Sequence, residues 1–357
     1  MAEIPVTVSE LSAEWLTAAL SESCPGAVVS DFDVEDAHAG TTGRALLRLF
    51  YADNPGAPER LFIKLPPDDP AQRAFVAEVG MGKKEAHFYR DLAGDLGIAV
   101  PRCYHAAFNE TGDRYIMVLE NLEARGCTFR NATTNYSLGY IREVLDAFAG
   151  LHSQFWNSPR FAADLDWIQP PTFHPMGPRL VEKALQQYSA SMPEIFSAMA
   201  ELYLARVEAV HALWNRGVPT LVHGDIHDGN LYYDPGFAGR GSPGFLDWGV
   251  MSRTSCMRDV AYFLAGTPTP EDRRAHQQEL LDYYYAALES RGTEQVDRSR
   301  LAEEFSWHIA YVWVAAVTTL AMGSEWQPVN YVSRTMQRLH QALEDNESLA
   351  AMQGALC

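Results

Sequence analysis

The stretch His223-Gly224-Asp225-Ile226-His227-Asp228-Gly229-Asn230 is the most informative part of this chain, because it sets an aspartate and an asparagine five positions apart in a short polar loop. The β-rich run 219–222 leads into this loop, and a second such run, 231–233, leads out of it. A motif of this kind carries weight only in the right structural context. The strand-like flanks supply that context, so we predict a loop held between two strands.

A hairpin is expected directly after this loop. Turn-forming residues lie at 234–236 and 239–244, and the apolar pair Phe245-Leu246 then runs into Asp247-Trp248-Gly249. Such a hairpin would carry Asn230 at one edge and return Asp247 beside it. An amide oxygen and a carboxylate would then be able to reach one metal ion.

The order Asp225, Asn230, Asp247 is typical of phosphoryl transfer from ATP. Protein kinases carry a catalytic loop H-R-D-x-x-x-x-N and a metal-binding turn D-F-G. In that chemistry one carboxylate orients the attacking hydroxyl, while an amide oxygen and a second carboxylate hold Mg²⁺ on the phosphates. We therefore predict that Asp225 is catalytic and that Asn230 and Asp247 bind the metal. The alternative for Asp225 and Asn230 taken alone is a simple Asx-type turn.

A kinase-like fold requires further parts upstream, the first being a glycine turn that covers the phosphates. Strand-like runs at 31–34 and 44–51 are joined through Ala39-Gly40-Thr41-Thr42-Gly43. Glycines let backbone amides approach phosphate closely, and threonine hydroxyls can add donors. The nucleotide-binding residues predicted in this turn are Gly40, Thr41, Thr42 and Gly43. A plain hairpin turn is the alternative.

A lysine and a glutamate are expected to act together next. The run Leu61-Phe62-Ile63-Lys64-Leu65 resembles the V-A-I-K strand of kinases, so we predict that Lys64 contacts the phosphates. A helix that starts with Asp69-Pro70, as N-cap and first helical residue, should bring a glutamate to this lysine. Glu78 and Glu85 lie seven apart on one helix face, so spacing does not choose between them. The apolar residues after Glu85 favour it.

A linker that binds adenine through its backbone should follow the strand Tyr115-Ile116-Met117-Val118-Leu119. We predict that Glu120 and Leu122 serve this role, on position alone. A plain core strand would account for the same run.

Together these features resemble the aminoglycoside phosphotransferase and choline kinase-like (ecdysteroid kinase-like) family of small-molecule kinases. His-Gly-Asp at 223–225, in place of His-Arg-Asp, favours this family over protein kinases, and Arg258-Asp259-Val260-Ala261 resembles its D-L-A helix start. The likeness covers about residues 31–264. It implies an α+β, bilobal protein-kinase-like fold, with a small antiparallel β-sheet lobe at 1–122 and a mainly helical lobe at 123–357. It also implies a structural role for Asp259.

The resemblance further implies an ATP- and Mg²⁺-dependent phosphotransferase that moves the γ-phosphate to a hydroxyl of a small molecule. The acceptor stays open among amino sugars, choline-like cations, sterol-like alcohols and acyl alcohols, and so does the oligomeric state. Two alternatives remain: a catalytically silent nucleotide-binding or regulatory protein on the same fold, and a protein-directed kinase.

Composition agrees with a globular enzyme. The chain has 357 residues, of which 47% are apolar and 21% charged. Its net charge of −18 argues against nucleic acid or an anionic membrane as a general partner. The five cysteines form no close pair, which favours a reduced, cytoplasmic protein. The most apolar stretch, 309–322, is too short to span a bilayer, so we predict a buried helix there and no membrane insertion.

Overall fold

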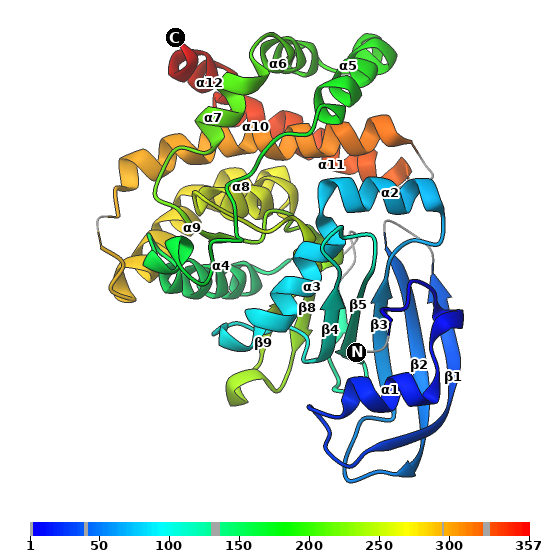
Figure 1. The fold of residues 1–357 in the computed structure, drawn as a ribbon. Coiled ribbons are helices and arrows are strands. Elements are labelled where there is room, and N and C mark those ends of the chain that lie inside the picture. The colour runs from blue at the N-terminus through cyan, green and yellow to red at the C-terminus, as the bar shows by residue number, and fades with distance from the viewer. Residues whose placement is uncertain (1–2, 39–41, 130–135, 295, 324–328) are drawn as a thin grey trace. The chain divides into compact units, whose positions relative to one another are not determined.

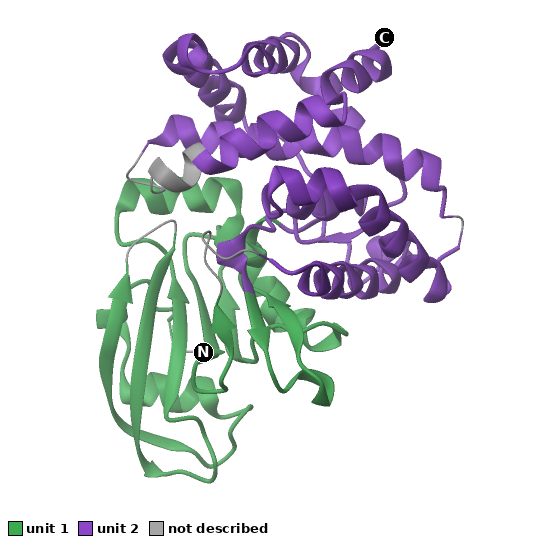
Figure 2. Ribbon diagram, turned by 180° about the vertical axis from the view of Figure 1, so that it is seen from behind, with its two compact units in different colours: residues 1–129, 232–250 green, residues 130–231, 251–357 purple. Residues whose placement is uncertain are grey.

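The protein divides into two compact units. The structure, a computed structural model, describes residues 3–38, 42–129, 136–294, 296–323 and 329–357. One unit comprises residues 1–129 and 232–250, and the other comprises 130–231 and 251–357 (Figure 2). The first holds an antiparallel sheet and the second is mainly helical, which confirms the predicted α+β class. The functional lobes 1–122 and 123–357 stay a prediction, because compactness does not say which unit binds what.

The first unit is built on a five-stranded antiparallel sheet in the order β1-β2-β3-β5-β4 (Figure 1). The strands are β1 (Val28–His38), β2 (Gly43–Asp53), β3 (Arg60–Leu65), β4 (Cys103–Phe108) and β5 (Tyr115–Glu120). The helices are α1 (Ala13–Leu20), α2 (Pro70–Val79) and α3 (Met81–Asp91). A smaller sheet, in the order β6-β8-β9, joins β6 (Thr128–Phe129), β8 (Leu231–Asp234) and β9 (Ser242–Phe245). The hairpin predicted after the polar loop is therefore present as β8 and β9.

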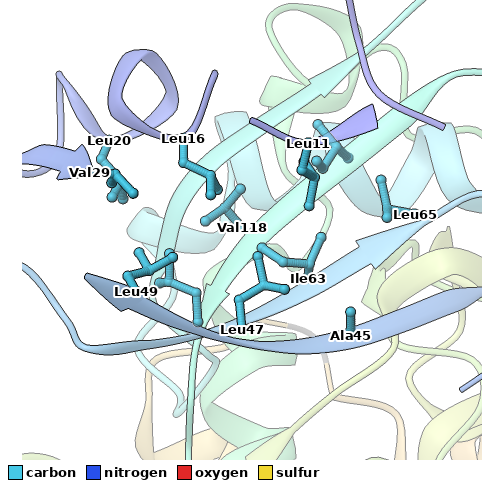
Figure 3. Packing of buried hydrophobic residues seen from close by; sticks show 12 residues of the cluster. Leu11, Leu16, Leu20, Val29, Ala45, Leu47, Leu49, Ile63, Leu65 and Val118 are labelled. Carbon is cyan, nitrogen blue, oxygen red and sulfur yellow. The ribbon is translucent and has the colours of Figure 1, made fainter. Parts of the chain in front are cut away.

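Successive side chains of a strand point to opposite faces, which makes the two faces of the large sheet chemically different. Leu47 and Leu49 of β2 and Ile63 of β3 are buried in one apolar cluster with Leu16 of α1. Figure 3 shows these side chains facing one another between the helix and the sheet. Because successive side chains of a strand point to opposite faces, Lys64 is directed to the other face of β3.

Helices α2 and α3 are separated by one glycine. The predicted start of α2 is confirmed, since Asp69 Oδ1 accepts the amide of Gln72 at 2.8 Å and Pro70 is the first helical residue. Gly80 ends α2 with a φ of 71°, in the left-handed region that glycine adopts without strain. Gly82, in contrast, lies inside α3, where a Cβ would come within 2.0 Å of the Tyr115 ring. Glycine at this position thus allows α3 to pack closely on β5.

Replacing Gly82 with alanine is expected to destabilise the protein. The added methyl group would collide with the ring of Tyr115, which is itself buried and cannot swing away. Overpacking of this kind costs about 1–3 kcal/mol. Urea unfolding should therefore show a lower midpoint for Gly82→Ala. The matched control is Gly94→Ala, because a Cβ there meets no atom within 4 Å; equal midpoints for both variants would contradict the packing argument.

The second unit is mainly helical. Its helices are α4 (Leu138–Gln154), α5 (Met176–Tyr188), α6 (Glu194–Ala205), α7 (Val207–Trp214), α8 (Met257–Gly266), α9 (Pro270–Ser290), α10 (Arg298–Met322), α11 (Val329–Asp345) and α12 (Ser348–Leu356). Two short antiparallel strands, β7 (Thr220–Val222) and β10 (Ser252–Thr254), pair beside them. Strand β7 leads into the polar loop, as the sequence predicts.

Helix α10 forms much of the core of this unit (Figure 1). It packs against α5, α8 and α11, and the indole of Trp214 donates to the carbonyl oxygen of Trp307 at 2.8 Å. The helix begins at Arg298, so the expected bounds 309–322 were too short. Over the described residues it is the one helix whose length and composition would allow it to cross a membrane, and 56% of its most apolar window is buried. Core helices of soluble proteins pass the same test.

Candidate active site

In the first unit, Lys64 and Glu85 form a buried ion pair. Lys64 Nζ lies 2.6 Å from both Glu85 Oε1 and Oε2, and the two side chains are only 6% and 2% exposed. Of the two glutamates that the spacing left open, Glu85 is therefore the one that meets the lysine. Burial raises the pKa of Glu85, and the charge of Lys64 opposes that rise. Helix α3 thus fixes the position of an ammonium group on the face of β3 opposite the apolar cluster.

Asp247 lies beside this pair. Its Oδ1 is 3.2 Å from Lys64 Nζ, and its Oδ2 is 3.3 Å from a guanidinium nitrogen of Arg44, the residue opposite Lys64 in the β2–β3 register. The backbone at Asp247 has a φ of 64°, a left-handed conformation that few residues other than glycine, asparagine and aspartate adopt. The carboxylate is 30% exposed. Strained backbone of this kind is common where a side chain must be aimed at a ligand.

Trp248 ties this turn to α3. Its ring stacks on Phe88, with ring centres 4.2 Å apart and planes inclined by 12°, and its indole nitrogen donates to the Phe245 carbonyl at 3.3 Å. Phe88 is three residues after Glu85 and so lies on the same helix face. One helix therefore places both the partner of Lys64 and the residue that follows Asp247.

The predicted glycine turn is described only in part. Gly40 and Thr41 lie outside the described residues. Thr42 is buried, and its hydroxyl has no hydrogen-bond partner among the residues that the structure describes. Gly43 opens β2, where a Cβ would lie 2.8 Å from the Pro66 carbonyl oxygen. A buried hydroxyl without a partner fits a ligand that accepts hydrogen bonds, such as a phosphate.

The predicted adenine linker follows β5. Glu120 pairs with Leu61 across the sheet, and its carboxylate accepts the Arg102 amide at 2.6 Å and the Arg125 guanidinium at 2.7 Å. The Leu122 carbonyl accepts the amides of Arg125 and Cys127 at 3.1 and 3.0 Å. The Glu120 side chain thus braces the linker.

In the second unit, the polar loop holds the Asp225 carboxylate from several sides. Oδ1 accepts the Tyr262 hydroxyl at 2.7 Å, and Oδ2 lies 3.3 Å from Asn230 Nδ2 and 3.7 Å from His227 Nε2. The Asp225 side chain nevertheless stays 35% exposed. A carboxylate that is oriented by neighbours yet open to solvent can accept a hydrogen bond from an incoming hydroxyl.

Asn230 turns its amide nitrogen toward Asp225. Nδ2 donates to the Asp225 carbonyl at 2.9 Å and to its carboxylate at 3.3 Å. Since the nitrogen faces the loop, the amide oxygen points to the other side, and that oxygen is the atom able to ligate a cation. Asn230 directly precedes β8, and Asp247 comes two residues after β9. The donor chemistry of Asn230 and Asp247 fits Mg²⁺, which favours oxygen ligands.

Asp259, in the first turn of α8, holds the polar loop through hydrogen bonds to its backbone. Its carboxylate accepts the backbone amides of His223 and Gly224 at 2.8 and 2.7 Å, and lies 3.2 Å from His152 Nε2. His152 in turn meets the Tyr284 hydroxyl at 2.7 Å through Nδ1. Burial raises the pKa of Asp259, but His152 and the loop amide outweigh this, so the pKa lies below its usual value. Gly224 has a φ of 86°, which glycine tolerates.

Replacing Asp259 with asparagine is expected to lower the free energy of unfolding by about 2 kcal/mol, because one loop amide loses a charged acceptor in a buried place. A folded-state pKa below the ordinary value of about 3.9 means that the carboxylate stabilises the fold above that pH, and that this contribution fades as acid protonates it. The difference between wild type and variant should therefore be largest near neutral pH and shrink below about pH 4.

Urea unfolding across this pH range tests the expectation for Asp259. Asp166→Asn, at an exposed position of the same unit, is the matched control. A difference that stays constant as the pH falls would show that Asp259 does not act through its charge.

Sequence reasoning missed several side chains that the structure places at these two sites. Tyr262, which positions Asp225, comes three residues after Asp259 on α8, so helical spacing from the Arg258-Asp259 motif could have found it. Arg44 could have been found by pairing β2 with β3. His152 is buried on α4 and meets Asp259, a contact that no motif in the sequence indicates.

Comparisons with known proteins agree with the fold described above. A choline kinase from Cryptosporidium parvum Iowa II shares 14% identity over 96% of this chain and 98% of its own, with a TM-score of 0.54. The GDP complex of wild-type aminoglycoside 2′-phosphotransferase-IIIa shares 13% identity over 94% and 100%, with a TM-score of 0.50. At such identities the likeness shows the fold alone, which is the protein-kinase-like fold of small-molecule kinases.

Among curated proteins, none matches this sequence. The model of one family, described as ecdysteroid kinase-like, matches residues 43–294. Because that match spans more than half of the chain, the protein belongs to the ecdysteroid kinase-like family of small-molecule kinases.

Proposed function

We propose that this protein transfers the γ-phosphate of ATP to a hydroxyl group of a small molecule in a Mg²⁺-dependent reaction. The observation that carries the proposal is the Asp225 carboxylate, which Tyr262 and Asn230 orient while it lines a cavity of the second unit. Catalysis of phosphoryl transfer depends mainly on positioning and electrostatics, and an oriented, accessible carboxylate is what it requires of the acceptor side.

Asp225 acts on the acceptor. Its carboxylate accepts a hydrogen bond from the acceptor hydroxyl and aligns that oxygen with the γ-phosphorus. As the new O–P bond forms, the bond between the γ-phosphorus and the bridging oxygen of ADP breaks, and the hydroxyl proton passes to Asp225. Because the Tyr262 hydroxyl donates to Oδ1 of this carboxylate, little free energy is needed to orient Asp225 for the reaction.

The other predicted residues act on the nucleotide. Lys64, held by Glu85, contacts the phosphates. The Thr42 hydroxyl and the backbone amide of Gly43 add donors, together with Gly40 and Thr41. The backbone of Glu120 and Leu122 receives the adenine. Asn230 and Asp247 would hold Mg²⁺. That ion, when bound, neutralises charge on the β- and γ-phosphates.

This assignment gives the two predicted lobes different roles. Residues 1–122 bind ATP, and 123–357 carry Asp225 and bind the acceptor. We further propose that the protein works in the cytoplasm on a soluble small molecule, in keeping with its free cysteines and its net negative charge.

The test is Mg²⁺-dependent release of ADP from ATP, measured across amino sugars, amino alcohols, sterols, hydroxy acids and hydroxyacyl thioesters. Stimulation by one class, abolished by removal of Mg²⁺, supports the proposal. ATP binding without stimulation by any class, or transfer to serine and threonine peptides, contradicts it. The first of these outcomes would favour a silent nucleotide-binding module, and the second a protein-directed kinase.

A further inference from the structure

A small cavity lies directly beside Asp225 in the second unit. Its volume is about 140 Å³, and its walls come from the polar loop, α8, α10 and α11. Cavities of about 150 Å³ hold a molecule the size of benzene. Since Asp225 and Tyr262 both line it, this space is where the reacting part of an acceptor would sit. That part is therefore compact, on the order of six non-hydrogen atoms.

The cavity carries both signs of charge. Two carboxylates line it, Asp225 and Asp228, and so do two guanidinium groups, Arg334 and Arg338. The arginines lie four residues apart on α11 and so share a face of that helix. The whole chain has 46 acidic residues and only 28 basic ones, so a pair of arginines here runs against the general excess of acid.

Arg338 is fixed at the cavity wall. Its Nη1 donates to the carbonyl oxygens of Gly266 and Thr267 at 2.9 and 2.8 Å, at the C-terminal end of α8. This anchoring fixes the guanidinium group of α11 against the C-terminal end of α8, the helix that carries Tyr262. Arg334, one turn earlier on α11, is exposed. An anchored arginine next to an exposed one forms a two-residue site that suits the planar oxygens of a carboxylate.

Asp228 contributes a buried carboxyl group to the wall of the cavity. Its side chain is buried, with the residue 8% exposed, and Oδ1 lacks a hydrogen bond of normal geometry among the described residues. Burial raises the pKa of Asp228, although the Tyr136 hydroxyl and the charges of Arg338 and Arg334 oppose the rise.

We propose that the acceptor is a compact alcohol that also carries an anionic group, such as a carboxylate. Its hydroxyl meets Asp225, and its anion meets Arg334 and Arg338. This assignment rests on the proposed function and names its substrate class. An ammonium group in the same place would lie against two guanidinium groups, and like charges brought together out of water are strongly disfavoured.

Three matched series of alcohols test the proposal. Each contains primary alcohols of three to five carbons, and the far end is a carboxylate, a hydroxyl or an ammonium group. We expect KM for the best carboxylate to be about 10- to 100-fold below that of the diol of equal length, the scale of hydrogen bonds to charged groups. The amino alcohols should be the poorest acceptors.

Two variants of Arg334 sharpen the test, because this exposed side chain can change without disturbing the core. Arg334→Gln should raise KM for the carboxylates about 10-fold and leave KM for the diols unchanged. Arg334→Glu should shift the preference toward the ammonium series. Arg179→Gln is the matched control, since Arg179 is exposed on α5 and does not line the cavity. Equal KM values for wild type and Arg334→Gln, or a wild-type preference for diols or ammonium, overturn the proposal.

Failure of the proposal and failure of the kinase assignment give different results. Calorimetric binding of the carboxylate series, in the presence of Mg²⁺ and a non-hydrolysable ATP analogue, reports on the cavity without turnover. Binding that Arg334→Gln weakens supports the anion site even if no phosphate is transferred. Absence of binding by every carboxylate overturns the anion site, and phosphate transfer to another class of alcohol would then leave the kinase assignment standing.

Discussion

Asp225→Asn is expected to remove phosphoryl transfer and to leave the affinity for ATP near that of wild type. The asparagine keeps the size of the side chain, and its amide oxygen can still accept the Tyr262 hydroxyl that orients Oδ1. It cannot take a proton, and it aligns the acceptor hydroxyl less well than a carboxylate does. Loss of a general base lowers kcat by about 10²- to 10⁴-fold.

The measurement is kcat for Mg²⁺-dependent ADP formation with the best acceptor, together with the dissociation constant for ATP. Asp166→Asn, an exposed change of the same chemistry in the same unit, should behave as wild type. Turnover of Asp225→Asn at the wild-type rate would overturn the catalytic assignment. Loss of ATP affinity together with turnover would point to a structural role for this carboxylate.

Asp247→Asn is expected to raise the Mg²⁺ concentration needed for half-maximal activity. It should also lower kcat by at least about 10²-fold, which is the effect of removing one group that stabilises the transition state. The carboxylate contributes a full negative charge to a divalent cation, and the amide contributes only a dipole. The fold should survive this change, because asparagine adopts the left-handed backbone found here, where φ is 64°, as readily as aspartate.

Because Asp247 also contacts Lys64, the stability of Asp247→Asn is a second measurement, independent of Mg²⁺ binding. In wild type the Lys64 ammonium group contacts both Glu85 and Asp247, so the variant keeps the Glu85 ion pair and replaces the second ion pair with a hydrogen bond to a neutral amide oxygen. A titration of activity with Mg²⁺ measures the metal, and urea unfolding measures the fold. Asp53→Asn, at the exposed end of β2, is the control. If Asp247→Asn requires no more Mg²⁺ than the control does, Asp247 does not bind the metal.

Much of the fold could be predicted because its signals are local. The strand that carries Lys64 and the N-cap at Asp69 each depend on a few neighbouring residues. The α+β class was expected from the family resemblance that these elements and the polar loop carry. The choice between Glu78 and Glu85 could not be made from spacing, since it depends on how α3 breaks from α2 at Gly80 and docks through Gly82.

The candidate site was predictable only where a motif names a residue. Asp225 and Asn230 are found from their spacing. Tyr262 lies on the helix of the Arg258-Asp259 motif, but it is 37 positions from Asp225, and the sequence does not show that the two side chains meet. Arg334 and Arg338 are farther still, on a helix with no sequence signal for ligand binding. Because the side chains that line the cavity are brought together only by tertiary packing, the proposal for the acceptor class rests on the cavity and not on the sequence.

The first unit is completed by a segment made late in synthesis. Trp248 stacks on Phe88, and Tyr232 joins Leu122 in a small buried cluster, so residues 232–250 cover surfaces of the first 129 residues. While the chain is emerging from the ribosome, those apolar surfaces stay uncovered until more than a hundred further residues have been made. Contacts so distant in sequence slow folding and expose the nascent chain to aggregation. A fragment that ends at residue 129 would carry the same exposed surfaces permanently, so the first unit has to be produced together with the hairpin β8–β9.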